Sequence, residues 1–200
     1  MPIFTRNNSK IFFVHIPKTG GTYVEDLFRA NGFQVHFWKP RRLLPVEAIS
    51  QQHYHLDILK NIFYMESFDY KFVTVRHPVK RLISEYKMRN PDQEVEINSW
   101  IDDTLDQASQ DPSYLDNHLR PQHEFHQEGI DIFKQEDGFD AAWASRLEAA
   151  IQTDLPHKLV KRRRDNRDFH QSFDPSQLEQ RVLEKIKSYY QKDFDYFDYD

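Results

Sequence analysis

The sequence predicts an α/β fold: a single three-layer domain spanning residues 1–200, with a central parallel sheet flanked by helices. Two segments carry this prediction, at residues 11–28 and 72–86, because in each a short buried-strand pattern runs into a turn and then an amphipathic helix. A chain of 200 residues without internal repeats or low-complexity linkers also fits one domain with a sizeable core.

The first strand is expected at residues 11–16, Ile-Phe-Phe-Val-His-Ile, which are β-branched or aromatic and nearly free of charge. Gly20 and Gly21 follow, and without side chains they let the backbone bend tightly and bring its N–H groups close to a ligand. Thr22 is the expected cap of a helix whose apolar residues recur at helical spacing. These apolar residues are Tyr23, Val24, Leu27 and Phe28.

The turn itself, Pro17-Lys18-Thr19-Gly20-Gly21-Thr22, has the features of a phosphate cradle. A helix N-terminus presents free N–H groups and the positive end of the helix dipole, and Lys18 adds a full charge beside it. The lysine precedes the glycines, unlike the Gly-x4-Gly-Lys-Ser/Thr loop of kinases and ATPases. An ordinary strand-to-helix turn is the alternative interpretation of these six residues.

The second unit is a strand at residues 72–75 followed by Arg76-His77-Pro78 and a helix. Pro78 suits the first helical position, where its missing N–H costs nothing. Arg76 then stands at the carboxyl end of a strand, where open α/β sheets bind ligands, and Ser84 lies two turns into the helix. Two strand ends, each with a cation, predict two phosphate positions. A surface ion pair is the alternative for Arg76.

The rest of the chain contains three further patterns. Residues 130–133 predict a short strand, residues 140–152 a helix, and residues 175–191 a second helix started by Ser172 or Asp174. The final residues 194–199 alternate aromatic side chains with aspartates and are expected to dock on the sheet edge.

Together the two strand–turn–helix blocks resemble the 3′-phosphoadenosine-5′-phosphosulfate (PAPS) dependent sulfotransferases. The closer likeness is to the carbohydrate branch that includes heparan sulfate 2-O-sulfotransferase and its small bacterial counterparts. Residues 15–22 are similar to the 5′-phosphosulfate loop of that family, and residues 75–86 to its 3′-phosphate motif, with His77 where aspartate is more usual. Residues 117–122 and 190–199 resemble weaker family signatures.

The resemblance implies a P-loop-containing domain and an enzyme, a PAPS-dependent O-sulfotransferase. It would transfer the sulfonate group to an acceptor hydroxyl, with a carbohydrate expected, and release 3′,5′-adenosine bisphosphate without requiring a metal. Arg76 and Ser84 match the 3′-phosphate ligands, and Lys18 matches the lysine that contacts the transferred sulfonate. The implied donor-binding residues are Pro17, Lys18, Thr19, Gly20, Gly21, Thr22, Tyr23, Arg76 and Ser84.

The catalytic candidates are Lys18, His53 and His55. Sulfonyl transfer builds charge on the departing phosphate oxygen, which a flexible lysine such as Lys18 can follow. Histidine titrates near neutral pH and suits a general base, and in an extended segment His53 and His55 would point the same way. They resemble the His-x-His pair of heparan sulfate 2-O-sulfotransferase, although the pattern does not say which is the base. Two solvated histidines are the alternative.

Other histidines are expected to play lesser roles. His15 is expected to pack or to form hydrogen bonds, while His118 and Arg120 are expected to line the acceptor cleft. His118, His123 and His126 do not have the spacing of a known metal signature, and no cysteine accompanies them.

Composition narrows the class of protein. The net charge of −5 argues against general nucleic-acid binding, although basic residues gather at positions 39–42 and 158–167. A solvated surface is the default for the longer cluster, and a flap over the donor or over an anionic acceptor is the alternative. The chain has no cysteine, no signal-peptide pattern and no apolar run long enough to span a membrane, which predicts a soluble cytoplasmic enzyme.

Two other functions stay open at this point. A nucleotide-dependent phosphotransferase, of the P-loop kinase type, would need a Mg²⁺-binding acidic residue at a strand end, where this chain has Arg76. An inactive module that only binds PAPS would not need Lys18, His53 and His55. The acceptor, which a small-molecule hydroxyl would also satisfy, and the oligomeric state cannot be read from the sequence.

Overall fold

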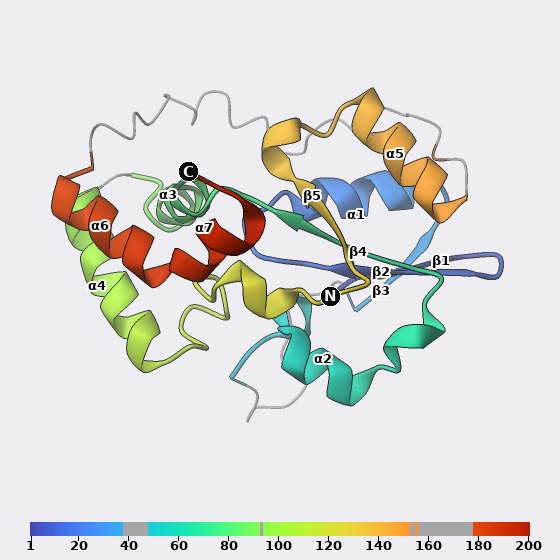
Figure 1. Cartoon of the computed structure of the whole chain (residues 1–200), viewed down its shortest axis with the longest axis horizontal. Coiled ribbons are helices and arrows are strands. Elements are labelled where there is room, and N and C mark those ends of the chain that lie inside the picture. The colour runs from blue at the N-terminus through green and yellow to red at the C-terminus, as the bar shows by residue number, and fades with distance from the viewer. Residues whose placement is uncertain (38–47, 93, 153–154, 156–177) are drawn as a thin grey trace.

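The computed structural model describes residues 1–37, 48–92, 94–152, 155 and 178–200. At its centre is a five-stranded sheet in the order β3-β1-β2-β4-β5 (Figure 1). The strands are β1 (Ile3–Arg6), β2 (Ser9–Val14), β3 (Gln34–His36), β4 (Tyr70–Val75) and β5 (Asp131–Lys134). The basic clusters predicted at 39–42 and 158–167 lie outside the described residues.

The sheet is mixed, which corrects the expectation of a parallel sheet. β2, β4 and β5 are parallel neighbours, whereas β1 pairs antiparallel with both β2 and β3. β1 and β2 form a hairpin that turns at Asn7, whose φ of 53° is a left-handed conformation that asparagine tolerates well. The apolar run before this turn is too short to stand out in the sequence.

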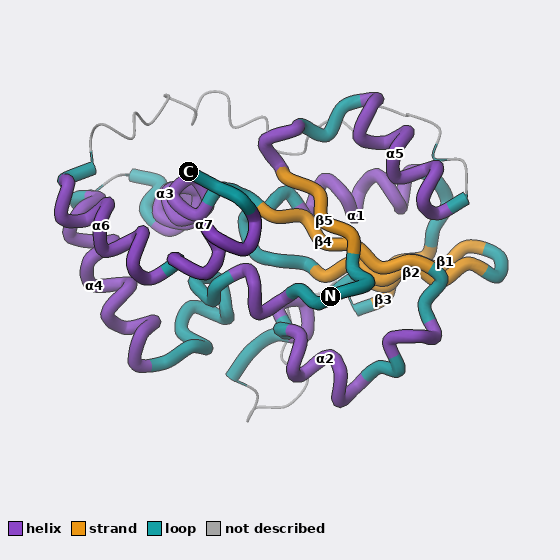
Figure 2. Tube along the Cα trace, viewed as in Figure 1, coloured by secondary structure: helices purple, strands orange, loops and turns teal. Residues whose placement is uncertain are grey.

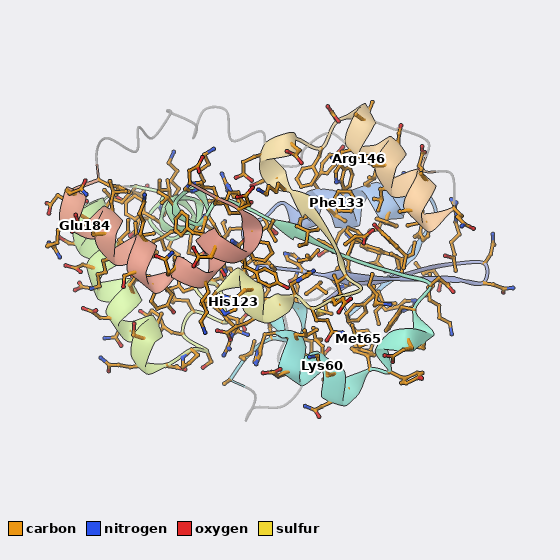
Figure 3. The ribbon with its side chains drawn as sticks, in the orientation of Figure 1. Lys60, Met65, His123, Phe133, Arg146 and Glu184 are labelled. Atoms are coloured by element: carbon orange, nitrogen blue, oxygen red, sulfur yellow. The ribbon has the colours of Figure 1, made fainter. Side chains whose placement is uncertain are left out.

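Helices cover both faces of the sheet, so the three-layer α/β fold is confirmed (Figure 2). α1 (Gly21–Ala30) and α5 (Ala141–Ile151) pack on one face, and α2 (Leu56–Ile62) packs on the other. Strand side chains alternate, so Phe13 points toward α1 while its neighbour Phe12 points toward α2. Figure 3 labels Phe133 and Met65 on these two opposite sides.

A third apolar cluster lies beside the sheet and is formed mainly by helices, with a few residues from the turns that join them. Its helices are α3 (Pro78–Arg89), α4 (Ile97–Gln110), α6 (Gln180–Tyr189) and α7 (Gln191–Phe197). The predicted helices at 78 and 140 are confirmed. The last long helix begins at Gln180 with Glu179 as its N-cap, so the predicted start at residue 175 is wrong. The tail forms α7 and meets edge strand β5, because Lys134 Nζ donates to the Asp198 carbonyl at 2.8 Å.

Within the described ranges, none of the helices has both the length and the apolar character needed to cross a lipid bilayer.

Candidate active site

The two predicted anion-binding blocks lie side by side, because β2 and β4 are adjacent parallel strands and their carboxyl ends point the same way. Arg76 Nη1 donates to the Lys18 carbonyl oxygen at 3.3 Å. The Thr19 hydroxyl is fully buried and bonds to the Ile16 carbonyl at 2.8 Å and to the Thr74 hydroxyl at 3.0 Å. The loop after β2 is thereby tied to β4, and the Thr19 hydroxyl is fully engaged inside the protein.

The two glycines of the loop are required for different physical reasons. Gly20 has a φ of 95°, and a Cβ there would lie 2.4 Å from the Phe139 ring. Gly21 has no unusual φ, but a Cβ there would lie 2.5 Å from Nε2 of His15. Gly20 is also the N-cap of α1, so the prediction that Thr22 caps this helix is wrong. Because the left-handed turn at Gly20 starts the helix early, Thr22 falls in its first turn and is exposed.

Positive side chains gather around this junction. Burial lowers the pKa of the Arg76 guanidinium, and the nearby Glu136 carboxylate opposes that shift. Burial also lowers the pKa of Lys87, and repulsion from Arg76 adds to the effect, so the two cations share one region. Ser84 is partly buried one turn before Lys87 on the same side of α3. Sequence reasoning missed Lys87, although its position three residues after Ser84 was a usable signal.

The segment after β5 covers the loop. The ring of Phe139 stacks on Tyr23 at 5.2 Å between centroids and 21° between planes. Glu136 accepts a hydrogen bond from the backbone N–H of His77 at 2.9 Å and one from the Tyr199 hydroxyl at 3.1 Å. An aromatic surface and a carboxylate therefore lie beside the loop and beside Arg76, and the local sequence gave no signal for either position.

Buried histidines form the second half of the site. Three of them are bonded through Nδ1 to a carboxylate: His15 to Glu25 at 3.0 Å, His53 to Asp116 at 2.8 Å and His118 to Glu85 at 2.7 Å. The His53 ring lies between the other two, with centroid distances of 5.8 Å to His15 and 4.6 Å to His118. The expectation that His15 forms a hydrogen bond is confirmed.

Burial and pairing set the protonation of this group. Burial lowers the pKa of His53, and the hydrogen bond to Asp116 opposes the shift without reversing it. Burial alone would raise the pKa of Asp116, but the bonds from His53 and Ser50 outweigh it and lower that pKa to about 2. At neutral pH the pair is therefore a neutral imidazole beside an ionised carboxylate.

His53 and His55 do not lie on one extended segment, which corrects the expected geometry. His53 ends a short 3₁₀ helix (Gln51–His53) and is 7% exposed, while His55 is the N-cap of α2 and is half-buried. A side chain from 3₁₀ backbone leaves the alternation that an extended strand would impose. Both histidines nevertheless contact one distant segment, at Asp116 and Asn117.

That segment has an unusual backbone. Leu115, Asp116 and Asn117 have consecutive φ values of 53°, 61° and 63°. A left-handed conformation costs L-residues roughly 1–2 kcal/mol each, so three in succession must be held by surrounding contacts. Strain of this kind concentrates at functional sites, and here it places Asp116 against His53.

A buried arginine supplies such contacts. Arg81 on α3 is 2% exposed and donates to three backbone carbonyls: Pro17 at 3.1 Å, His118 at 2.7 Å and Arg120 at 3.0 Å. The guanidinium therefore clamps the loop after β2 to the segment that contacts the histidines. Arg120 in turn donates to Asn117 Oδ1 at 2.9 Å.

A metal ion was not expected here, and one group of residues bears on that expectation. His53, Asp116 and His118 place potential ligand atoms within 4.8 Å of one another. Asp116 is already bonded to His53, however, and His118 is already bonded to Glu85. In the described structure these side chains form two hydrogen-bonded histidine–carboxylate pairs. His123 lies elsewhere, beside Asp193 of α7 at 2.8 Å (Figure 3).

Comparison with known proteins adds a family assignment to this geometry. A family model described as "Sulfotransferase family" matches residues 1–200. No curated protein and no solved structure gives a significant match.

Proposed function

The chain belongs to the sulfotransferase family, and from this premise we propose that it transfers the sulfonate group of PAPS to an acceptor hydroxyl, with a carbohydrate as the expected acceptor. The observation that carries the proposal is the contact between Arg76 and the Lys18 carbonyl. This contact brings together the ends of β2 and β4, each followed by a positively charged residue. A donor that carries phosphates at both ends needs two such positions close together.

The residues around this contact suit a polyanion. The N-terminus of α1 and Lys18 would hold the 5′-phosphosulfate, and Arg76 with Ser84 and Lys87 would hold the 3′-phosphate. The stacked ring of Tyr23 offers a flat surface for a purine base beside the loop. The backbone N–H groups of Gly20 and Gly21 complete the proposed cradle, with Pro17, Thr19 and Thr22 as their neighbours.

Catalysis would rest on charge and on one proton acceptor. The bound donor supplies an activated sulfonyl group. Lys18 would stabilise the negative charge that develops on the leaving phosphate oxygen. A histidine of the pair His53 and His55 would accept the proton of the acceptor hydroxyl, since a neutral imidazole near pH 7 suits that task.

The first test measures donor binding by isothermal titration calorimetry with 3′,5′-adenosine bisphosphate and no Mg²⁺. We expect binding by the unaltered protein and at least tenfold weaker binding by Arg76→Ala, because a charge-assisted contact to phosphate is lost. Arg181→Ala is the matched control, since Arg181 is exposed and pairs with Asp102 on α4. Absence of binding, or a response to Mg²⁺–ATP alone, would overturn the proposal.

The second test identifies the acceptor class. Radiolabelled PAPS is offered with glycans, phenols and simple alcohols, and transfer of label is followed together with release of 3′,5′-adenosine bisphosphate. Transfer to glycans supports the carbohydrate assignment. Transfer confined to phenols or alcohols would keep the sulfotransferase and reject the carbohydrate.

A further inference from the structure

The side-chain amide of Asn117 has a single possible orientation. Its Nδ2 lies 2.9 Å from the His53 carbonyl, which can only accept, and its Oδ1 lies 2.9 Å from Arg120 Nε, which can only donate. The same Nδ2 lies 3.3 Å from Nδ1 of His55. Because Nδ2 is the donor, Nδ1 of His55 must be the acceptor, and the ring proton of neutral His55 is on Nε2.

The neighbouring residue imposes the opposite tautomer on His53. Asp116 accepts from the backbone N–H of Ser50 and from its hydroxyl, the latter at 2.7 Å, and its remaining contact is with Nδ1 of His53 at 2.8 Å. An ionised carboxylate only accepts, so Nδ1 of His53 carries the proton and Nε2 holds the lone pair. In the described part of the chain, the hydrogen bonds of this ring are all at Nδ1.

The two assignments have one structural source. Asp116 and Asn117 are adjacent in the left-handed turn, so one strained segment turns a carboxylate toward one histidine and an amide N–H toward the other. Arg81 holds the residues that follow this turn, through the carbonyls of His118 and Arg120. The tautomers are therefore set by geometry before any acceptor binds.

We propose that His53 is the general base and that His55 is a hydrogen-bond donor to the acceptor, with Asp116 and Asn117 as the residues that position them. This proposal rests on the proposed function. His53 Nε2 takes the proton that the acceptor hydroxyl loses as its oxygen bonds to the donor sulfur. The broken sulfur–oxygen bond leaves its electron pair on the departing phosphate, and Asp116 stabilises the imidazolium that forms.

The first experiment reads the tautomers directly and does not depend on activity. Long-range ¹H–¹⁵N correlation spectra of the ¹⁵N-labelled protein at pH 7.5 distinguish protonated from unprotonated ring nitrogens, and His53→Gln and His55→Gln identify the signals. We expect Nε2 to be unprotonated in His53 and protonated in His55. The same tautomer in both rings, or the reverse pair, would overturn the proposal.

The Asp116→Asn variant tests whether Asp116 sets the tautomer of His53 or only supports the fold. The N–H of Ser50 requires an acceptor at one position of the new amide, so the amide nitrogen faces His53 and should move the ring proton to Nε2. We expect that tautomer shift together with a loss of turnover of at least a hundredfold. An unchanged tautomer with unchanged turnover would refute the positioning role.

Turnover separates the two histidines. A glutamine amide can replace an Nε2–H donor but cannot act as a base, so His55→Gln should lose no more than tenfold, while His53→Gln should lose a hundredfold or more. The exposed His36→Gln is the control. All variants are also titrated with 3′,5′-adenosine bisphosphate. If the unaltered protein does not bind this nucleotide, the proposed function is rejected. If binding is normal but His55→Gln is inactive and His53→Gln is active, only the assignment of the two histidines is rejected.

Discussion

Gln122 pairs with Arg76 in the way that one strand pairs with another. The backbone N–H of Arg76 donates to Gln122 Oε1 at 2.9 Å, and its carbonyl accepts from Gln122 Nε2 at 2.8 Å. These two bonds extend the backbone hydrogen-bonding pattern of β4 by one residue beyond the strand. The side chain of Gln122 that makes them is fully buried. The part of the chain that contacts the histidines is thereby joined to Arg76, the residue proposed to bind the 3′-phosphate.

Lys18→Ala should lower turnover by about two to three orders of magnitude, the loss seen when one electrostatic donor to a developing charge is removed. Affinity for 3′,5′-adenosine bisphosphate should fall less, because that product lacks the sulfonate that Lys18 is proposed to contact. Steady-state kinetics and calorimetry on the same preparation check both expectations. Lys60→Ala, at an exposed position on α2, is the control, and near-normal turnover of the Lys18 variant would remove the role.

Glu136→Gln should bind 3′,5′-adenosine bisphosphate several-fold more tightly. The Glu136 carboxylate acts on the charge of Arg76 and would repel a phosphate there, while a glutamine oxygen can still accept from the His77 N–H. The gain should shrink as salt is raised, because screening weakens the repulsion. Calorimetry at 50 mM and 500 mM salt measures both effects, and an affinity that is lower or unchanged contradicts the prediction.

Gly21→Ala should destabilise the fold by about 1–3 kcal/mol, the usual cost of overpacking. The cause is the ring of His15, which a new methyl group would meet at 2.5 Å, since the backbone at this glycine is not itself strained. Urea denaturation gives the free energy of unfolding. In a protein that already carries His15→Ala, adding Gly21→Ala should cost less free energy of unfolding than it does in the unaltered protein, because the ring is gone. Equal costs in the two backgrounds would show that the ring is not the cause.

Stability should fall as the pH drops below 6.5. Burial lowers the folded-state pKa of His15, His53 and His118, so in mild acid the unfolded chain binds protons that the folded chain does not. The free energy of unfolding then decreases by up to about 1.4 kcal/mol per pH unit for each histidine. Below their ordinary pKa values, Asp116 and Glu85 add a loss of the same sign, since their folded pKa values are about 2.

Urea denaturation midpoints at pH 7.5, 6.0 and 5.0 measure this dependence. His118→Gln should flatten the profile by removing one titrating group, and His36→Gln, at an exposed position, should leave it unchanged. Equal stability at pH 7.5 and pH 5.0 would show that the three histidines are not buried in the neutral form.

Much of the fold was predictable because its signals are local. The apolar runs at residues 11–16 and 72–75 and the helical spacing after each predicted β2, α1, β4 and α3. The sequence did not predict the hairpin of β1 and β2, because a strand of four residues before a two-residue turn shows too little alternation of apolar and polar residues to be recognised. The prediction that Thr22 caps α1 is wrong because Gly20 adopts a left-handed conformation and starts the helix two residues earlier, and the residue types alone do not reveal that conformation.

The sequence by itself determined that two strand–turn–helix units exist, since spacing and residue type are local properties, and it predicted Lys18, Arg76 and a histidine pair as the groups that carry the chemistry. Only the tertiary structure decided which carboxylate meets which histidine. The partners of His53 and His118 lie 63 and 33 positions away along the chain, and Asp116 reaches its histidine through a left-handed turn. Burial and long-range contact are properties of the folded chain, so the tautomers and the pKa values of the site arise only once the sheet and α3 have assembled.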